Sequence, residues 1–186
     1  MHDEDNVLME QVKNGDKSAY EALVIKHRAK AVSFAYSFIY DLYESEDIAQ
    51  ECFARIYINR MSYKFSNTFK TYLFTVIRNA CIDYLRQNKN NRPINLDDIT
   101  EISRISNNIT PEDSFIKEEI MTLIFKHIDS LPDNYKTALY LFAVDNMNYG
   151  EIAKITKKSI PQVKIIIYRA RAKLKKLCEG DDIFEK

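Results

Sequence analysis

The sequence predicts an all-α protein: two small helical domains joined by a flexible linker, the C-terminal one with a helix-turn-helix. Three observations predict this fold class. Apolar residues recur at helical spacing along most of the 186-residue chain, and only 3 glycines and 4 prolines interrupt it. No segment carries a strand-like pattern of note. A tract rich in Asn, Ser, Asp and Thr separates the two periodic halves, and this composition is typical of linkers.

The first domain is expected to consist of helices only. Gly15 suits the left-handed position after a first helix, and Asp16 can cap the second. Ser45 and the two acidic residues after it are expected to start a third helix, because negative charge favours a helix N-terminus. The helices are predicted at about 6–13, from 17 onward, at 45–59 and at 69–87.

One side of the second helix is predicted to be buried. A lone histidine on such a stripe is more typical of a satisfied residue at the edge of the core than of a metal ligand. The three cysteines lie far apart, so we expect them to be reduced thiols. The stripe consists of Tyr20, Leu23, Val24, His27, Ala31, Phe34, Ala35 and Phe38.

Composition argues against several classes of function. The 27 basic residues balance 27 acidic ones. No apolar run approaches the roughly 18 residues of a membrane span, and the acidic N-terminus is unlike a signal peptide, so we expect a cytoplasmic protein without membrane insertion. There is no Cys/His pair with zinc-ligand spacing and no glycine-rich phosphate loop, and nothing suggests a nucleophile–base arrangement. We therefore expect no enzyme, no cofactor, no metal and no small-molecule substrate.

The segment that breaks the helical pattern is expected to be a flexible, acidic linker. Beyond it, helical periodicity resumes near Pro111. The expected organisation is a first domain over 1–88, the linker over 89–111, a second domain over 112–178 with helices at about 112–129 and from Pro132, and an acidic tail over 179–186.

Two capping-box patterns mark the helix-turn-helix. Asn148 and Glu151 have the spacing of an N-cap and its third helical residue, and Ser159 and Gln162 repeat it. Pro161 falls in the first turn of the second helix, where its missing N–H costs nothing. One apolar stripe then follows at steps of four and three residues. It consists of Val163, Ile167, Ala170, Leu174 and Leu177.

The same region concentrates positive charge. Nine Lys or Arg and no acidic residue lie between Lys154 and Lys176. Attraction to phosphates supplies most of the sequence-independent affinity of a DNA-binding surface. A basic second helix in a helix-turn-helix therefore predicts a DNA-reading element. The alternative is a solvated basic helix of the kind found in any helical protein.

Three motifs, in this order, resemble the extracytoplasmic-function sigma factors of bacterial RNA polymerase. This is the small group of the sigma-70 family, reduced to its second and fourth regions. The resemblance covers about residues 6–177 and implies an alternative sigma factor that binds core RNA polymerase and directs promoter-specific initiation. The motifs are Leu8–Asp16, Ser45–Phe53, and the set of Leu131-Pro132, Glu151-Ile152-Ala153 and Arg169-Ala170-Arg171.

The resemblance implies a docking face on the third helix. Asp47, Gln50 and Glu51 fall at i, i+3 and i+4 and therefore share a helix face. Ile48 and Cys52 lie on a neighbouring face and can reach the core. In the family this polar face binds a coiled coil of the largest polymerase subunit. From the residues alone, a solvated acidic face is the alternative.

Recognition and melting of the −10 element are assigned by the resemblance to the loop after this helix and to the fourth helix. Single-stranded DNA is held by stacking on aromatic rings and by basic side chains, and an extruded base needs amide or hydroxyl partners. Phe69, Phe74 and Ile77 are expected in the core, and Tyr72 in either environment. The candidate −10 residues are Tyr63, Lys64, Phe65, Asn67, Lys70, Tyr72, Arg78, Asn79 and Arg86.

The −35 element is expected to meet the first half of the basic helix, which enters the major groove in this motif. The chain departs from the family here, with Lys157 at the usual turn glycine and Ile165-Ile166 where Ser-Arg is common. Apolar side chains contact thymine methyls, whereas Arg prefers guanine, so a T/A-rich element is implied. Alternatively, Ile166 widens the buried stripe. The candidates are Ser159, Gln162, Lys164, Ile165, Ile166 and Arg169.

The expected partners are core RNA polymerase, promoter DNA and an anti-sigma factor, an inhibitor common in the family. The alternative function is a helix-turn-helix regulator that acts without polymerase. Such a regulator has no use for the Asp47/Gln50/Glu51 face or for the loop after it, and this difference separates the two hypotheses.

Overall fold

The computed structural model describes residues 4–88, 126–128 and 130–180. Every element in these ranges is a helix, so the predicted all-α class is confirmed. The chain divides into two compact units, residues 1–94 and 95–186. The expected linker at 89–111, all but three residues of the expected helix at 112–129, and most of the tail at 179–186 lie outside the described residues.

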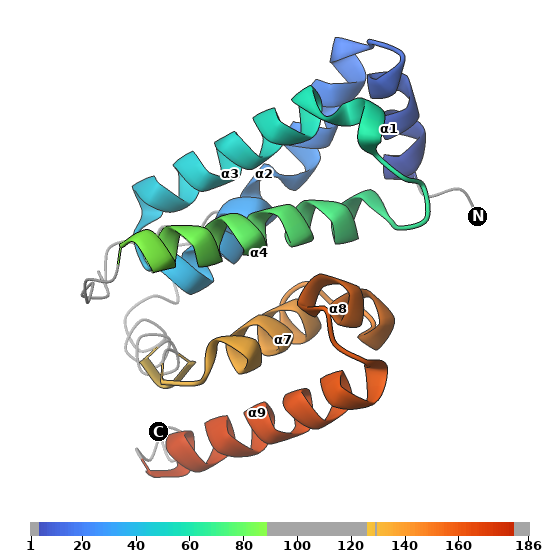
Figure 1. Cartoon of the computed structure of the whole chain (residues 1–186). Helices are drawn as coiled ribbons and strands as arrows, with labels where there is room; N and C mark the ends of the chain where they lie inside the picture. The colour runs from blue at the N-terminus through green and yellow to red at the C-terminus, as the bar shows by residue number, and fades with distance from the viewer. Residues whose placement is uncertain (1–3, 89–125, 129, 181–186) are drawn as a thin grey trace, which may run out of the picture. The chain divides into compact units, whose positions relative to one another are not determined.

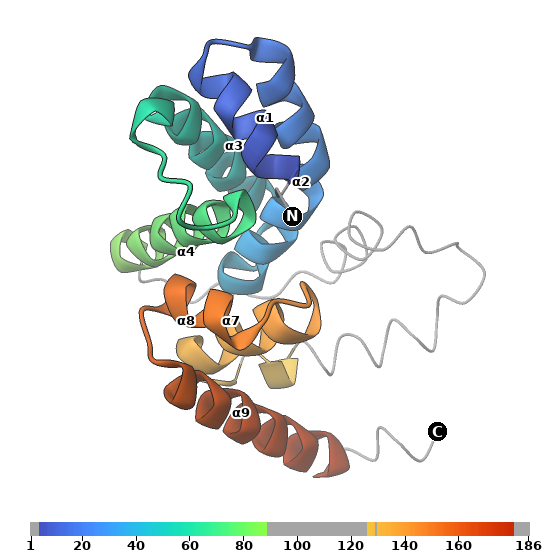
Figure 2. The ribbon, with the colours of Figure 1, turned by 90° about the vertical axis from the view of Figure 1, so that its right-hand side faces the viewer.

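The first unit is a helical bundle built around its second helix. In it α2 packs against α1, α3 and α4, and α3 packs against α4. Figures 1 and 2 show α1 at the end of the bundle where α3 leads into α4. The elements are α1 (Glu4–Lys13), α2 (Lys17–Ile39), α3 (Leu42–Ile58), the 3-10 turn η1 (Arg60–Ser62) and α4 (Phe69–Gln87).

Local signals place the start of α2 as predicted. Gly15 has a φ of 95°, a conformation that glycine adopts without steric cost. Asp16 is the N-cap, and its carboxylate accepts hydrogen bonds from the backbone N–H of Ser18 at 2.8 Å and of Ala19 at 3.2 Å. The helix ends at Tyr40, which takes the left-handed conformation with φ 56°.

The third helix starts earlier than the sequence predicted. Its N-cap is Asp41, whose carboxylate accepts from the backbone N–H of Glu44 at 3.0 Å. Ser45 lies inside the helix and is fully buried, and its hydroxyl donates to the carbonyl of Asp41 at 2.6 Å. The expectation that Ser45 begins the helix was wrong, because Asp41 is the first capping side chain after the left-handed residue that ends α2.

The core of the first unit is rich in aromatic rings. Phe34 packs edge-to-face against Phe38 and Phe74, with ring centroids 5.2 and 4.8 Å apart, a geometry that aromatic pairs favour. His27 is buried at the core edge as predicted, and its ring lies 5.4 Å from that of Phe69. Phe69, Phe74 and Ile77 are buried as expected, whereas Tyr20 and Val24 of the α2 stripe are only half-buried.

Among the described residues of the second unit there are three helices, and each packs against the other two. They are α7 (Asp133–Ala143), α8 (Tyr149–Thr156) and α9 (Ile160–Gly180). Leu131, Leu139 and Ala170 form a buried cluster, and Tyr135 and Leu174 pack against it. Of the predicted α9 stripe, Val163, Ile167 and Ala170 are buried, and Leu174 and Leu177 are half-buried.

Candidate nucleic-acid interface

The polar face expected on α3 is exposed. Asp47, Gln50 and Glu51 are all accessible, while Ile48 and Cys52 are buried on the neighbouring face. The carboxylate of Glu51 pairs with the guanidinium of Arg55 at 2.6 Å, one helical turn further along. Because both side chains of this pair are more than half exposed, a partner protein can compete for Glu51 at little cost.

The loop between η1 and α4, residues 63–68, presents aromatic and basic side chains at its tip. Lys64, Phe65 and Ser66 are exposed, and Asn67 and Thr68 are half-buried. Thr68 is the N-cap of α4, and its hydroxyl accepts from the backbone N–H of Thr71 at 3.2 Å. The loop therefore ends in a fixed helix start while its tip remains open to solvent.

Tyr63 organises this loop instead of projecting from it. Its side chain is only 4% exposed, and its ring contacts those of Phe65 and Tyr72, with centroids 5.1 and 5.2 Å away. Its hydroxyl donates to Oδ1 of Asn6 at 2.5 Å and lies 3.2 Å from the carbonyl oxygen of Asn67. The expectation that Tyr63 itself contacts DNA is thus corrected, because its ring has no free face for a base. Phe65 and Tyr72 retain partly exposed rings.

Several candidate −10 residues share one side of α4. Tyr72, Asn79 and Arg86 are spaced by seven residues, which returns to nearly the same helix face. They are half-buried, exposed and exposed, respectively. The guanidinium of Arg86 lies 3.3 Å from the carboxylate of Asp83 on the same face. Arg78 and Lys70 are half-buried beside this row.

Both capping boxes of the helix-turn-helix are formed. The Asn148 side chain accepts from the backbone N–H of Gly150 and Glu151 at 2.9 and 3.0 Å, and the Glu151 carboxylate accepts from the Asn148 N–H at 3.0 Å. At the start of α9, Oε1 of Gln162 accepts from the N–H of Ser159 at 2.9 Å, and Oγ of Ser159 accepts from the N–H of Gln162 at 3.4 Å. These caps fix the first turn of each helix.

The two isoleucines at the start of α9 lie in different environments. Ile165 is 50% exposed, and Ile166 is half-buried next to the apolar stripe. Ile165 is therefore accessible to a base, whereas Ile166 is only partly accessible, and both hypotheses for Ile166 stay open. The other candidate −35 residues, Ser159, Gln162, Lys164 and Arg169, are exposed.

An aromatic stack that the sequence did not predict holds two α9 cations. The rings of Phe142 and Tyr149 stack with centroids 5.4 Å apart and planes 9° from parallel. The Arg171 guanidinium lies over Phe142 at 5.0 Å, and the Lys164 ammonium over Tyr149 at 5.6 Å. Each cation interacts with a ring face, so the stack orders two charges that lie seven residues apart on one side of α9.

The positive charge of the second unit lies at the surface. All nine Lys and Arg residues between Lys154 and Lys176 are exposed. One of them, Lys175, reaches Glu179 at 3.5 Å. An exposed row of cations on and around a recognition helix can attract DNA phosphates while the helix N-terminus reads bases.

The described residues contain no group of three or more His, Cys, Asp or Glu placed to hold a metal ion. Cys52 and Cys81 are fully buried, and burial raises the pKa of the Cys52 thiol to about 12 and also raises that of Cys81. Both thiols are therefore protonated and unreactive at neutral pH. No helix among the described residues is long and apolar enough to cross a membrane.

Two family models match the chain. The first, described as Sigma-70 region 2, matches residues 23–91, and the second, described as Sigma-70, region 4, matches residues 123–174.

Curated relatives align over nearly the whole chain. The sequence is 32% identical to the ECF RNA polymerase sigma factor SigW of Bacillus subtilis, covering 90% of this chain and 93% of that protein. It is 30% identical to the ECF RNA polymerase sigma-E factor of Escherichia coli K12, covering 90% of each. It is also 28% identical to the RNA polymerase sigma-H factor of Pseudomonas aeruginosa, covering 94% and 93%.

Solved structures share the fold. CnrH in complex with the cytosolic domain of CnrY superposes with a TM-score of 0.75 at 23% identity, covering 96% of this chain and 99% of that one. The sigma factor RpoE of Bartonella quintana, in complex with the anti-sigma factor NepR, superposes with a TM-score of 0.66 at 18% identity, covering 87% and 98%.

Proposed function

Because the chain belongs to the extracytoplasmic-function sigma factors of the sigma-70 family, we propose a division of labour between its two units. The protein is an alternative sigma factor that binds core RNA polymerase and directs initiation at specific promoters. In this proposal the first unit docks on polymerase and reads the −10 element, and the second reads the −35 element. The chain acts by binding, without chemistry of its own, in the cytoplasm beside the polymerase.

The observation that carries the proposal is the exposed polar face of α3. Asp47, Gln50 and Glu51 lie on a helix whose neighbouring face is buried in the core through Ile48 and Cys52. A regulator that acts without polymerase needs only the second unit. Docking on polymerase through α3 accounts for its exposed polar face. In this proposal it also holds the 63–68 loop at a fixed distance from the polymerase surface.

Reading of the −10 element is supported by the rings beside that loop. Phe65 and Tyr72 each keep part of a ring accessible, and stacking on such rings holds single-stranded DNA without reading its sequence. Lys64 at the loop tip and Arg86 on α4 supply charge for the backbone. The amide of Asn79 is an exposed neutral hydrogen-bonding group on the same face of α4.

Reading of the −35 element is supported by the capped start of α9. Gln162 uses Oε1 in the capping box, which leaves its amide N–H groups free to donate to a base acceptor. Ile165 offers an apolar contact for a thymine methyl. The exposed Lys173 lies further along the helix, where phosphate contact is the expected role.

An inhibitory protein partner completes the proposal. Two solved structures that share this fold were obtained with the cytosolic domain of CnrY and with the anti-sigma factor NepR. We therefore include an anti-sigma factor among the partners of this chain, with the exposed α3 face as one surface for which it competes with polymerase.

The docking face is tested by single substitutions measured for binding to core polymerase. Gln50→Ala and Glu51→Ala should each weaken binding roughly tenfold if they lie at the centre of the contact. Surface substitutions away from special features change stability by about 0.5 kcal/mol or less, so the fold should persist. Glu21→Ala, at an exposed acid on α2, is the matched control. Parent-like binding by both α3 variants would place the docking surface elsewhere.

A further inference from the structure

Two polar side chains of α1 fasten the 63–68 loop near both of its ends. Asn6 accepts from the Tyr63 hydroxyl at 2.5 Å, and its own Nδ2 donates to the carbonyl of Asn67 at 3.4 Å. Lys13 donates to the carbonyl of Tyr63 at 3.1 Å, and its ammonium lies 5.2 Å from the centre of the Phe65 ring. The loop is therefore tied to a helix some 50–61 residues away in sequence.

The spacing of these two side chains along α1 lets both of them reach the loop. Asn6 and Lys13 lie seven residues apart, which is about two turns, so they project from nearly the same face of α1. Between them Met9 and Val12 have no exposed surface. The apolar anchors hold α1 in the bundle, and the polar pair is thereby held at a fixed distance from the loop.

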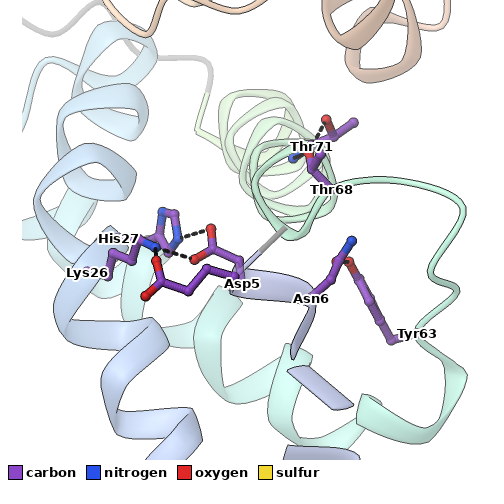
Figure 3. Close-up of polar contacts among 8 residues, drawn as sticks. Asp5, Asn6, Lys26, His27, Tyr63, Thr68 and Thr71 are labelled. Atoms are coloured by element: carbon purple, nitrogen blue, oxygen red, sulfur yellow. Dashed lines mark hydrogen bonds and ion pairs between the residues drawn. The ribbon is translucent and has the colours of Figure 1, made fainter. Parts of the chain in front are cut away.

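The start of α1 is fastened in turn to α2. The Asp5 carboxylate lies 2.7 Å from Nε2 of His27 and 2.7 Å from the ammonium of Lys26, as Figure 3 shows beside the Asn6–Tyr63 contact. Hydrogen bonds with Asp5 and then Glu4 raise the pKa of Lys26, so its charge persists in this arrangement. Asp5 and Asn6 are neighbours in sequence. One turn of α1 therefore links the core of the bundle to the loop.

A loop that reads a single extruded base needs such external support. Its exposed tip, residues 64–66, would otherwise sample many conformations, whereas selective contacts require side chains held within about 0.5 Å of the productive geometry. Tyr63 passes this support on to the loop, because its ring contacts both Phe65 and Tyr72, the two rings proposed to stack on the single-stranded −10 DNA.

We propose that Asn6 and Lys13 are positioning residues for −10 recognition. They touch no base themselves and act through Tyr63 and Phe65. This inference rests on the proposed function of the loop, and it adds that α1 determines how strictly the loop selects its base. Loss of either side chain should relax the −10 preference while docking and −35 reading continue.

The experiment uses holoenzyme assembled from the full chain and core polymerase. Forked promoter DNA with a randomised, single-stranded −10 segment is selected, and the base preference at each position is counted. Asn6→Ala removes the hydrogen bonds of Asn6 with Tyr63 and Asn67 and should flatten the preference at one position by about threefold to tenfold, the range expected when one or two modest hydrogen bonds are lost. Tyr63→Phe, which removes one hydroxyl, should flatten the same position. The double variant should do little more than Asn6→Ala alone, because both single changes remove the bond between Asn6 and Tyr63.

Two further variants separate positioning from other roles. Asn6→Asp keeps the acceptor for the Tyr63 hydroxyl and should restore part of the preference. Gln11→Ala, at an exposed α1 position, is the control and should behave like the parent. Lys13→Met should also relax the base preference. If Lys13 instead contacts phosphate directly, this variant weakens all sequences equally and flattens the salt dependence, which would overturn its assignment.

The outcomes distinguish the positioning role of Asn6 and Lys13 from the proposed function of the loop. If the parent selects a −10 base and Asn6→Ala and Tyr63→Phe select it equally well, the positioning role is refuted and the function of the loop stands. If these variants lose core binding and −35 preference as much as −10 preference, the contacts serve folding alone. A parent with no −10 preference overturns the proposed function, and the positioning role with it. If Asn6→Ala does not fold, Tyr63→Phe decides by itself.

Discussion

Lys157, in the turn of the helix-turn-helix, has a backbone conformation that is unfavourable for a lysine. Its φ and ψ are 54° and 43°, in the left-handed region. A residue with a Cβ pays roughly 1–2 kcal/mol there, whereas glycine enters at no steric cost. The turn is closed by hydrogen bonds from the N–H of Lys158 to the carbonyl of Ala153 at 2.9 Å and from the N–H of Lys157 to that of Lys154 at 3.4 Å, the pattern of a Schellman motif.

Replacing this residue, Lys157→Gly, should therefore stabilise the second unit. The exposed Lys157 side chain makes no ion pair or hydrogen bond within the described part of the chain, so relief of strain dominates. Glycine gains unfolded-state freedom of about 0.5–1 kcal/mol, which offsets part of the gain. The net expectation is a stabilisation of about 0.5–1 kcal/mol. Lys158→Gly is the matched control, because Lys158 is exposed but does not have a positive φ, and it should destabilise by a similar amount.

Native-state hydrogen exchange of the full chain measures this effect locally. Amides of α8 and α9 should exchange about two to five times more slowly in Lys157→Gly than in the parent, and faster in Lys158→Gly. Amides of the first unit should not change. Equal or faster exchange of α8 and α9 in Lys157→Gly would refute the assignment of strain to this turn.

Three further predictions concern both units. Burial lowers the pKa of His27 below its ordinary value of 6.5, although Asp5 opposes the shift, so the unfolded chain binds the proton more readily. Stability should be full above pH 6.5 and fall as the pH drops below it, and urea unfolding of His27→Gln should show a flatter pH profile. Gln162→Ala should change the base preferred at one −35 position, by roughly 1–3 kcal/mol of discrimination, whereas Lys173→Ala should weaken binding to all sequences about equally and reduce the salt slope by about 1. Selection from a randomised −35 library separates the two behaviours. A change of preferred base in Lys173→Ala would contradict its assignment to phosphate. Phe142→Ala removes one of the two stacked rings. It should weaken DNA binding without changing the base preference, and the same library tests this expectation.

Local patterns predicted much of the second unit. The Asn148–Glu151 and Ser159–Gln162 caps join residues three apart, so their chemistry is visible in a short window of sequence, and both formed as expected. The start of α3 was predicted wrongly, because two capping side chains lie in the same short window of sequence. Asp41 and Ser45 both carry capping side chains, and the helix begins with Asp41 as its N-cap, directly after the left-handed Tyr40, while Ser45 is buried inside it.

Contacts between distant segments were beyond local patterns. Tyr63 lies in a polar stretch and was expected to face DNA, but a partner 57 residues away on α1 draws its hydroxyl inward. Nothing near Tyr63 in the sequence indicates that partner. The aromatic stack escaped prediction in the same way, because Phe142 and Arg171 meet only after α7 and α9 have packed.

Run-off transcription reconstituted from this chain and core RNA polymerase tests the central claim most directly. Genomic fragments serve as templates, with polymerase alone and chain alone as controls. The account predicts specific transcripts from a subset of fragments only when both proteins are present, and fewer of those transcripts with Glu51→Ala at limiting concentrations of the chain. Tight, specific binding of duplex DNA by the isolated chain, with no effect on polymerase, would contradict it and support a regulator that acts without polymerase.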